Sequence, residues 1–248
     1  MRNLYLGIKL SLAYFSLLPM RFARKDNLQA ASVLNGMLLF LPWVGLLLAG
    51  GVILLYGLLS PLGWYGALVA GICYMMFYGF LHTEAVIDVF DALFAAHGGK
   101  DAYDVMKEPT VGAIGVLYGV GFFLLKLAGI VWVLNHGYLA EFVAIVVISR
   151  LSLLSLIVLH DFRSAFLTQL KEALDAWYLM MLFVFFVLFG SWITPYFIPL
   201  LLTGVILGFL ISLYFAAKLR FVNGDVLGTT LEGVEIILLL LVSLWMSC

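Results

Sequence analysis

The stretch LGWYGALVAGICYMMFYGFLHTEAVIDVFDALF, residues 62–94, joins a long apolar run to three carboxylates. Residues 62–81 carry no charge, and Glu84, Asp88 and Asp91 follow directly after them. A bilayer core is about 30 Å thick, so a helix that crosses it needs about 20 apolar residues. The run therefore predicts a membrane-spanning helix. Acids inside or at the edge of such a helix are costly and are usually retained for function.

The composition of the whole chain agrees with a membrane protein. Of its 248 residues, 65% are apolar and 11% are charged, and the mean hydropathy is +1.15. Soluble domains are about half apolar and about a quarter charged. The apolar runs are continuous rather than alternating, which excludes a β-barrel. The net charge of −1 gives no support for a nucleic-acid partner, and Cys73 and Cys248 have no metal-site spacing.

Six further runs of similar length predict an all-α bundle of about seven transmembrane helices in a single domain, residues 1–248. The N-terminal arm, residues 1–32, is expected to form an interfacial helix. Lys9 interrupts its apolar pattern, and no cleavage site of a signal peptide follows. The expected spans are residues 33–57, 62–81, 111–134, 139–159, 176–193, 196–217 and 230–247.

Lysine and arginine alternate between the two sides of these spans. They occur in the N-terminal arm and in the connections after the second, fourth and sixth spans, whereas the other connections and the C-terminus have none. Because basic residues mark the cytoplasmic side, we expect the N-terminus inside and the C-terminus outside. The acids then fall on the cytoplasmic side, with Glu141 as the exception. The active part of the protein is therefore expected to face the cytoplasm.

The three acids after the second span share one face of a predicted helix. Glu84, Asp88 and Asp91 are spaced by four and then three residues, which places them within about 60° of one another around the helix. Like charges at this spacing repel, so a neutralising partner is expected. Mg²⁺ is usually held by one or two carboxylates together with water and substrate phosphates, and it suits this pattern. A solvated acidic helix end is the alternative.

A second acidic group, HGGKDAYDVMKEPTVGAIG, residues 97–115, precedes the third span. Its glycine pair is expected to end the preceding helix, and Asp101 is expected to cap a short one. Lys107 and Glu108 adjoin the third span, and we place them in the site. Residues 82–110 would then form a cytoplasmic acidic connection. A solvated amphipathic face explains the acids before Lys107 equally well.

The third acidic group is FVNGDVLGTTLEGVEI, residues 221–236. Asn223 and Asp225 belong to a turn signal within a cytoplasmic connection expected over residues 218–232. In a continuous helix Asp225 and Glu232 would lie two turns apart on one face. Glu232 follows the start of an apolar run, where an acid is costly and is expected to be functional. A simple helix-capping role for Asp225 is the alternative.

Two cations lie within the expected spans, Lys126 in the third and Arg150 in the fourth. Each could pair with Glu232 or Glu235 in a structural role, or could receive an anionic group of a substrate. The planar guanidinium of arginine suits phosphate somewhat better. His82 falls on the opposite helical face from the three acids that follow it, and no pair of histidines has zinc-protease spacing.

The order and spacing of these groups resemble the cobalamin synthase family, the adenosylcobinamide-GDP ribazoletransferases. The signature of that family reads approximately H-L-D-G-L-A-D-T-x-D-G-x-F, and residues 82–94 read HTEAVIDVFDALF in register. The family segment M-R-D-S-x-x-G-x-x-G corresponds to MKEPTVGAIG, residues 106–115. The family element T-G-D-x-L-G corresponds to NGDVLG, residues 223–228. Glu84 stands where the family usually has Asp, and Ala85 and Ala92 stand where it usually has glycine.

The resemblance implies a Mg²⁺-dependent transferase in the bacterial cytoplasmic membrane, with a corrinoid-GDP and α-ribazole as small-molecule substrates. The hydroxyl of α-ribazole, or of its 5′-phosphate, attacks the cobinamide-side phosphorus of adenosylcobinamide-GDP, and GMP leaves. A homo-oligomer is compatible with the sequence. The roles carried over are metal binding by Glu84, Asp88, Asp91 and Asp225, catalysis by Asp91, Glu108 and Glu232, and substrate binding by His82, Lys107, Arg150 and Asn223.

Two other classes use similar residues. A CDP-alcohol phosphotransferase also holds a pyrophosphate substrate through acids and Mg²⁺, but its D-G-x-x-A-R signature is absent from the chain. An ion-coupled transporter would also use intramembrane Glu, Lys and Arg, but would show internal repeats and sites near the bilayer midplane. The sequence has no such repeat, and its acids cluster on one side.

Overall fold

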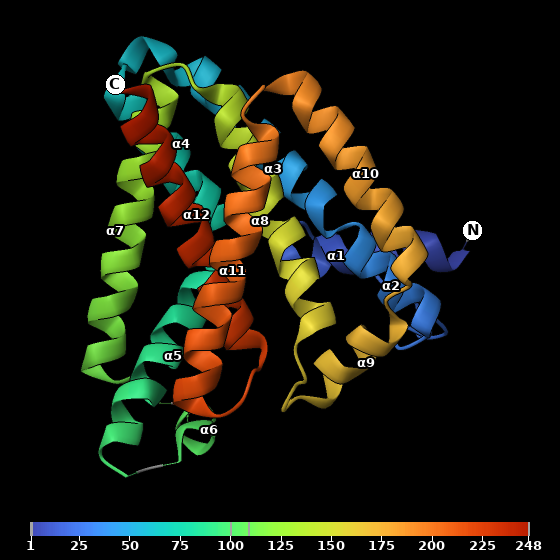
Figure 1. Ribbon diagram of the computed structural model, residues 1–248. Helices are drawn as coiled ribbons and strands as arrows, with labels where there is room; N and C mark the ends of the chain where they lie inside the picture. The colour runs from blue at the N-terminus through green and yellow to red at the C-terminus, as the bar shows by residue number, and fades with distance from the viewer. Residues whose placement is uncertain (1, 100, 109, 248) are drawn as a thin grey trace.

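The computed structural model describes residues 2–99, 101–108 and 110–247, and within these ranges the chain is all-α, as expected (Figure 1). The long helices run roughly side by side, and the shorter ones lie across them or at their ends. The elements are α1 (Arg2–Phe15), α2 (Ala31–Leu39), α3 (Leu41–Leu59), η1 (Ser60–Leu62), α4 (Trp64–Phe77), α5 (Leu81–His97), α6 (Ala102–Val105), α7 (Ala113–Asn135), α8 (Leu139–Leu159), α9 (Ala165–Ala173), α10 (Ala176–Ile193), α11 (Phe197–Leu219) and α12 (Gly224–Met246).

Six helical segments in the described part of the chain are long and apolar enough to cross a membrane, or seven if the bent pair α4 and α5 counts as one span. The first segment, residues 31–62, joins α2, α3 and η1. The spans expected at 139–159 and 176–193 coincide with α8 and α10. The protein is therefore a multi-pass membrane protein.

The span expected at residues 62–81 is broken in the structure. α4 has 14 residues, about 21 Å of helix, which is short of the bilayer core. It ends where Gly79 adopts φ +67, with its N–H bonded to Met76 O at 2.8 Å and the Phe80 N–H bonded to Met75 O at 3.1 Å. This pair of bonds is a Schellman motif. α5 then departs at 75°, so the acids lie on a separate helix rather than at the end of a straight span.

Connections with basic residues gather at one end of the bundle, which we call the basic end (bottom of Figure 1). The α5–α7 connection, α9 and the turn before α12 lie there. The predicted connection over 218–232 is much shorter than expected, because α12 begins at Gly224. Asn223 accepts a hydrogen bond from Val226 N at 3.0 Å. This N-cap stabilises the start of the helix, so the residues that follow are helical rather than part of the connection.

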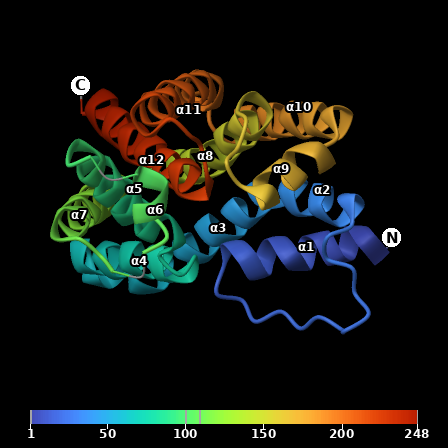
Figure 2. The ribbon, with the colours of Figure 1, turned by 90° about the horizontal axis from the view of Figure 1, so that it is seen from below.

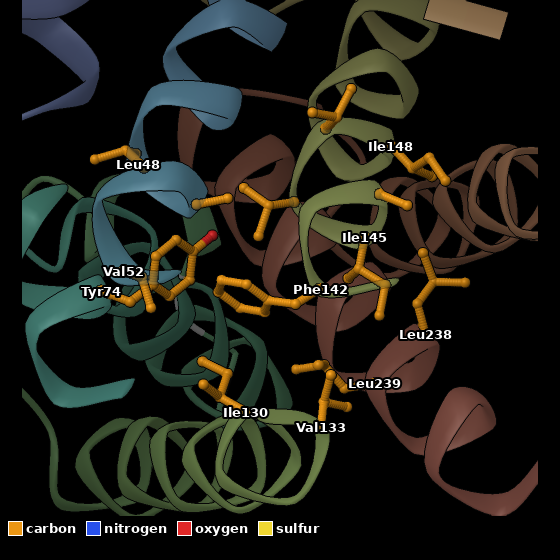
Figure 3. Packing of buried hydrophobic residues seen from close by; sticks show 14 of the residues in the cluster. Leu48, Val52, Tyr74, Ile130, Val133, Phe142, Ile145, Ile148, Leu238 and Leu239 are labelled. Carbon is orange, nitrogen blue, oxygen red and sulfur yellow. The ribbon is translucent and has the colours of Figure 1, made fainter. Parts of the chain in front are cut away.

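The core of the bundle surrounds α8. In the apolar stretch of α8, 78% of the residues are buried inside the protein, compared with 11% for α10. α8 is therefore the central helix, and α10 lies at the edge of the bundle with most of its residues exposed. Figure 3 shows the core between α3, α4, α7, α8 and α12, where the Tyr74 ring meets Phe142 edge-on, with 5.6 Å between ring centroids.

The N-terminal arm forms the helix α1 and an extended connection to α2. Both views show α1 running crosswise to the long helices (Figures 1 and 2). α1 crosses α2 at Gly7, where an added Cβ would lie 2.7 Å from Val33 O and 2.8 Å from Gly36 Cα. The crosswise orientation is the one expected for an interfacial helix.

Candidate functional site

The site is built where α5 packs against α12 at the basic end. The two helices approach closely at Gly228, where an added Cβ would lie 2.9 Å from the Ala85 Cβ. This contact brings the acids of the first and third groups together. Asp88 is subject to charge repulsion from Asp225, Glu84 and Asp91, and Asp225 in turn from Glu84. We call Glu84, Asp88 and Asp225 the acid cluster.

The charge of the acid cluster is not neutralised by protein. No ion pair within residues 2–99, 101–108 and 110–247 joins these three acids to a lysine or an arginine. No three His, Cys, Asp or Glu side chains of these ranges converge closely enough to enclose a metal ion. Mg²⁺ needs only one or two protein carboxylates beside water and phosphate oxygens. These carboxylates, which have no cationic partner among the described residues, therefore offer oxygen ligands that fit Mg²⁺, with water and phosphate as the other ligands.

Asn223 holds Asp225 in place. Its side-chain nitrogen donates to Asp225 Oδ2 at 2.7 Å, while its oxygen caps α12. Tyr14 of α1 lines the same cavity as Asp225. Burial and, secondly, the negative charge of Asp225 raise the pKa of Tyr14 above its usual value. Asn223 is thus a positioning residue in the structure, and its predicted contact with substrate stays a prediction.

Asp91 makes a contact that the sequence analysis did not foresee. Its two carboxylate oxygens accept hydrogen bonds from the backbone N–H groups of Gly112 and, at 2.7 Å, of Gly115. These groups form the N-terminus of α7. A carboxylate there accepts hydrogen bonds from N–H groups that have no partner within the helix, and its negative charge interacts favourably with the helix dipole. Asp91 therefore ties α5 to α7. Its predicted roles in metal binding and catalysis stay predictions.

Replacing Gly115 by alanine is expected to lower the free energy of unfolding by about 1–3 kcal/mol, because the new methyl group overpacks this contact. Its Cβ would lie 2.5 Å from both Asp91 Cγ and Ile87 O. Equilibrium unfolding in mixed micelles measures the change. Gly121 on the same helix has open space at its Cβ position, so Gly121→Ala is the matched control and should not destabilise. Equal stability of the two variants would contradict this role of Gly115.

Lys107 and Glu108 lie in the connection between α6 and α7. Both are exposed after α6, and Lys107 Nζ sits 3.9 Å from the centroid of the Tyr103 ring. Glu108 and Asp91 line one cleft beside the start of α7. The glycine pair ends α5 as predicted, and Asp101 caps α6 by accepting from Tyr103 N at 2.8 Å. The roles of Lys107 and Glu108 toward substrate stay predictions.

Arg150 and Glu232 belong to a buried ion-pair network. Lys126 Nζ lies 2.8 Å from Glu232 Oε2 and 2.7 Å from Glu235 Oε2. Arg150 pairs with Glu235, and Ser149 Oγ donates to the same carboxylate at 2.8 Å. We call Lys126, Arg150, Glu232 and Glu235 the ion-pair network; two positive and two negative charges balance within it.

Arg150 and Glu232 are 2% and 1% exposed, so solvent does not reach them. Of the two roles considered for Arg150, the structure shows the structural one, in which Arg150 pairs with a buried acid. Glu232 likewise forms an ion pair with Lys126. The tyrosines that complete the network were missed by the sequence analysis: Tyr74 OH donates to Glu235 at 3.0 Å and Tyr78 OH to Glu232 at 2.8 Å. They are four residues apart, Tyr74 in the last turn of α4 and Tyr78 directly after it, and this spacing is the signal that could have identified them.

His82 lines a cavity next to the acid cluster. The cavity has a volume of about 110 Å³ and is mostly apolar, and Asp225 and Gly228 form part of its wall. Ala85, which replaces a usual glycine of the family, also lines it. Asp225 thus belongs to both the acid cluster and the wall of the cavity.

The fold and the site define a multi-pass membrane protein with an acid-lined site at one end of a helical bundle. The chain belongs to the cobalamin-5-phosphate synthase family, whose model matches residues 7–243. It is 27% identical to an adenosylcobinamide-GDP ribazoletransferase of Clostridium perfringens, over 95% of this chain and 96% of that one. It is 29% identical to the enzyme of the same name from Thermosynechococcus vestitus, over 80% and 82% of the two chains. No solved structure matches the chain.

Proposed function

We propose that this protein is a membrane-bound transferase that joins adenosylcobinamide-GDP to α-ribazole or its 5′-phosphate. The products would be adenosylcobalamin or its phosphate, and GMP. The observation that carries the proposal is the match of residues 7–243 to one family of membrane enzymes. The acid cluster supports it, because carboxylates without a cationic partner can hold the Mg²⁺ that neutralises a pyrophosphate.

We assign binding of Mg²⁺ to one or two carboxylates of the acid cluster, Asp225 among them, with water and phosphate oxygens as the other ligands. The bound ion would neutralise charge on the pyrophosphate and on the departing GMP. Asn223 orients Asp225 through its 2.7 Å hydrogen bond, and Asp91 fixes the start of α7 beside the cluster. Glu108, exposed in the neighbouring cleft, remains a candidate for accepting the proton of the attacking hydroxyl. Glu232 is not a candidate for this role, because its carboxylate pairs with Lys126 and accepts a hydrogen bond from Tyr78.

The basic end is proposed to face the cytoplasm of a bacterial cell. Lys107, Arg163, Lys171 and Lys218 lie in or beside the connections at that end, and such residues mark the cytoplasmic side of membrane proteins. Both substrates would then reach the acid cluster from the cytoplasm.

Purified protein in lipid nanodiscs is expected to release GMP from adenosylcobinamide-GDP when α-ribazole and Mg²⁺ are both present. Omission of α-ribazole, or removal of Mg²⁺ by EDTA, should abolish the release, because each is required for the transfer. Chromatography of nucleotides and corrinoids follows both products. A helical, monodisperse preparation that releases no GMP would contradict the proposal. Release of CMP from a CDP-alcohol, or ion flux in liposomes, would then favour the rival classes.

A further inference from the structure

The cavity beside the acid cluster is lined by helices from the whole length of the chain. α2, α3 and α8 form its inner wall with Leu38, Leu41 and Leu153, and α9 contributes Leu170. Tyr14 of α1 and Phe166 of α9 also line it, with 6.1 Å between their ring centroids. Apolar and aromatic walls with few polar groups are typical of small-molecule sites.

His82 is the polar group that points to a ligand. It is 5% exposed, it lines the cavity, and within the described residues no hydrogen bond joins its ring to another group. A buried polar group without a partner is unfavourable and usually has one supplied by water or a ligand. A neutral imidazole donates one N–H and accepts at its other nitrogen. His82 therefore offers the cavity a hydrogen-bonding group within a mostly apolar lining, to which Tyr14 and Asp225 also contribute.

The volume of the cavity and its apolar, aromatic lining favour an aromatic ring. Its volume is about 110 Å³, which approaches the roughly 150 Å³ of an apolar cavity that binds benzene. The cavity is not closed, so a fused second ring can extend toward its opening. Asp225 and Gly224, at the N-terminus of α12, line the same cavity. A ring held here would keep its substituent close to the acid cluster.

We propose that this cavity binds the benzimidazole ring of the acceptor nucleoside, with His82 donating its N–H to the unsubstituted ring nitrogen. The attached ribose then leaves the cavity on the side of Asp225, which places its attacking hydroxyl beside the acid cluster. This inference rests on the proposed function, since it assigns the acceptor of that reaction to one part of the site.

A pair of adjacent leucines on α8 tests the assignment. Leu153 lines the cavity, and Leu154 is buried in the neighbouring core but does not line it. Leu153→Phe fills the cavity and is expected to raise the KM for α-ribazole by about tenfold or more, while the KM for adenosylcobinamide-GDP stays within about twofold. Leu154→Phe, the matched control for overpacking, should change both KM values equally or not at all. An unchanged ratio of the two KM values in Leu153→Phe would overturn the proposal.

A binding measurement without the donor substrate separates this proposal from the proposed function. Equilibrium dialysis compares α-ribazole with the α-riboside of 5,6-dimethylindole, which has a C–H in place of the ring nitrogen. The wild-type protein should bind the indole about tenfold more weakly, and His82→Leu should bind both equally. Equal binding of both ligands by the wild type would overturn the role of His82, even if GMP release is normal. Absence of GMP release with intact α-ribazole binding would contradict the proposed function alone.

Discussion

Replacement of Glu235 by alanine is expected to lower the free energy of unfolding by about 3–5 kcal/mol, because it leaves uncompensated charge inside the bundle. Glu235 is 1% exposed and pairs with both Lys126 and Arg150. Its loss leaves two cations with Glu232 as their one partner in the network. Tyr74 and Ser149 also lose the acceptor of their hydrogen bonds. Equilibrium unfolding in mixed micelles, followed by helical circular dichroism, measures the change.

A charge-balanced double variant is the control for this prediction. Arg150→Met combined with Glu235→Leu removes one charge of each sign and leaves the pair of Lys126 and Glu232 intact. Replacement of a whole buried ion pair by apolar residues is often nearly neutral. We therefore expect the double variant to recover most of the stability that Glu235→Ala loses. A double variant that is less stable than Glu235→Ala would show that the network stabilises through packing or hydrogen bonds rather than charge balance.

The ion-pair network connects the helices that build the site. Tyr78 lies directly before the break between α4 and α5, and its hydroxyl bonds to Glu232 of α12 at 2.8 Å. Lys126 of α7 joins the same carboxylate. The helices that carry His82 and Asp225 are thus held together about two turns above the acid cluster. Arg150 and Glu232, to which the sequence analysis gave roles in the chemistry, instead help to fix the positions of the groups to which we assign it.

The transmembrane helices could be predicted where the apolar run alone determines them. The limits of α8 and α10 coincide with the predicted spans, because charged or turn-forming residues bound both runs. The break after α4 could not be predicted in the same way. Gly79 adopts φ +67 and ends the helix, yet its position in an apolar run looks the same as that of glycines at helix contacts. Only the backbone conformation distinguishes the two uses of glycine.

The site could be predicted in part. Spacing on one helix gathers Glu84 and Asp88, and the resemblance to the family added Asp225, which the structure places beside them. The partner of Arg150 depends on how α8 packs against α12. No local sequence pattern could therefore show whether Arg150 pairs with Glu235 or with a phosphate of the substrate. The cavity of His82 also arises from tertiary packing, since α1, α9 and α12 all contribute to its walls.

Replacement of Asp225 by asparagine is expected to reduce kcat/KM for GMP release by about 100-fold or more. Loss of one Mg²⁺ ligand removes several kcal/mol of charge stabilisation from the transition state, and each 1.36 kcal/mol corresponds to about tenfold in rate. The concentration of Mg²⁺ needed for half-maximal rate should rise as well. Asp161→Asn is the matched control. That acid lies in a connection at the basic end and pairs with Lys171 instead, so its replacement should leave both quantities within about twofold.

The stability of Asp225→Asn should change in the opposite direction from its activity. Asp225 repels Asp88 in the protein without a cation, so removal of its charge relieves repulsion and should leave the melting temperature equal or slightly higher. Asn223 can still donate to the new amide oxygen, and its cap on Val226 N is unaffected. Mg²⁺ should therefore raise the melting temperature of the wild type more than that of the variant. A variant that melts well below the wild type without Mg²⁺, yet shows the same shift with it, would mean that Asp225 stabilises the fold and does not bind the cation.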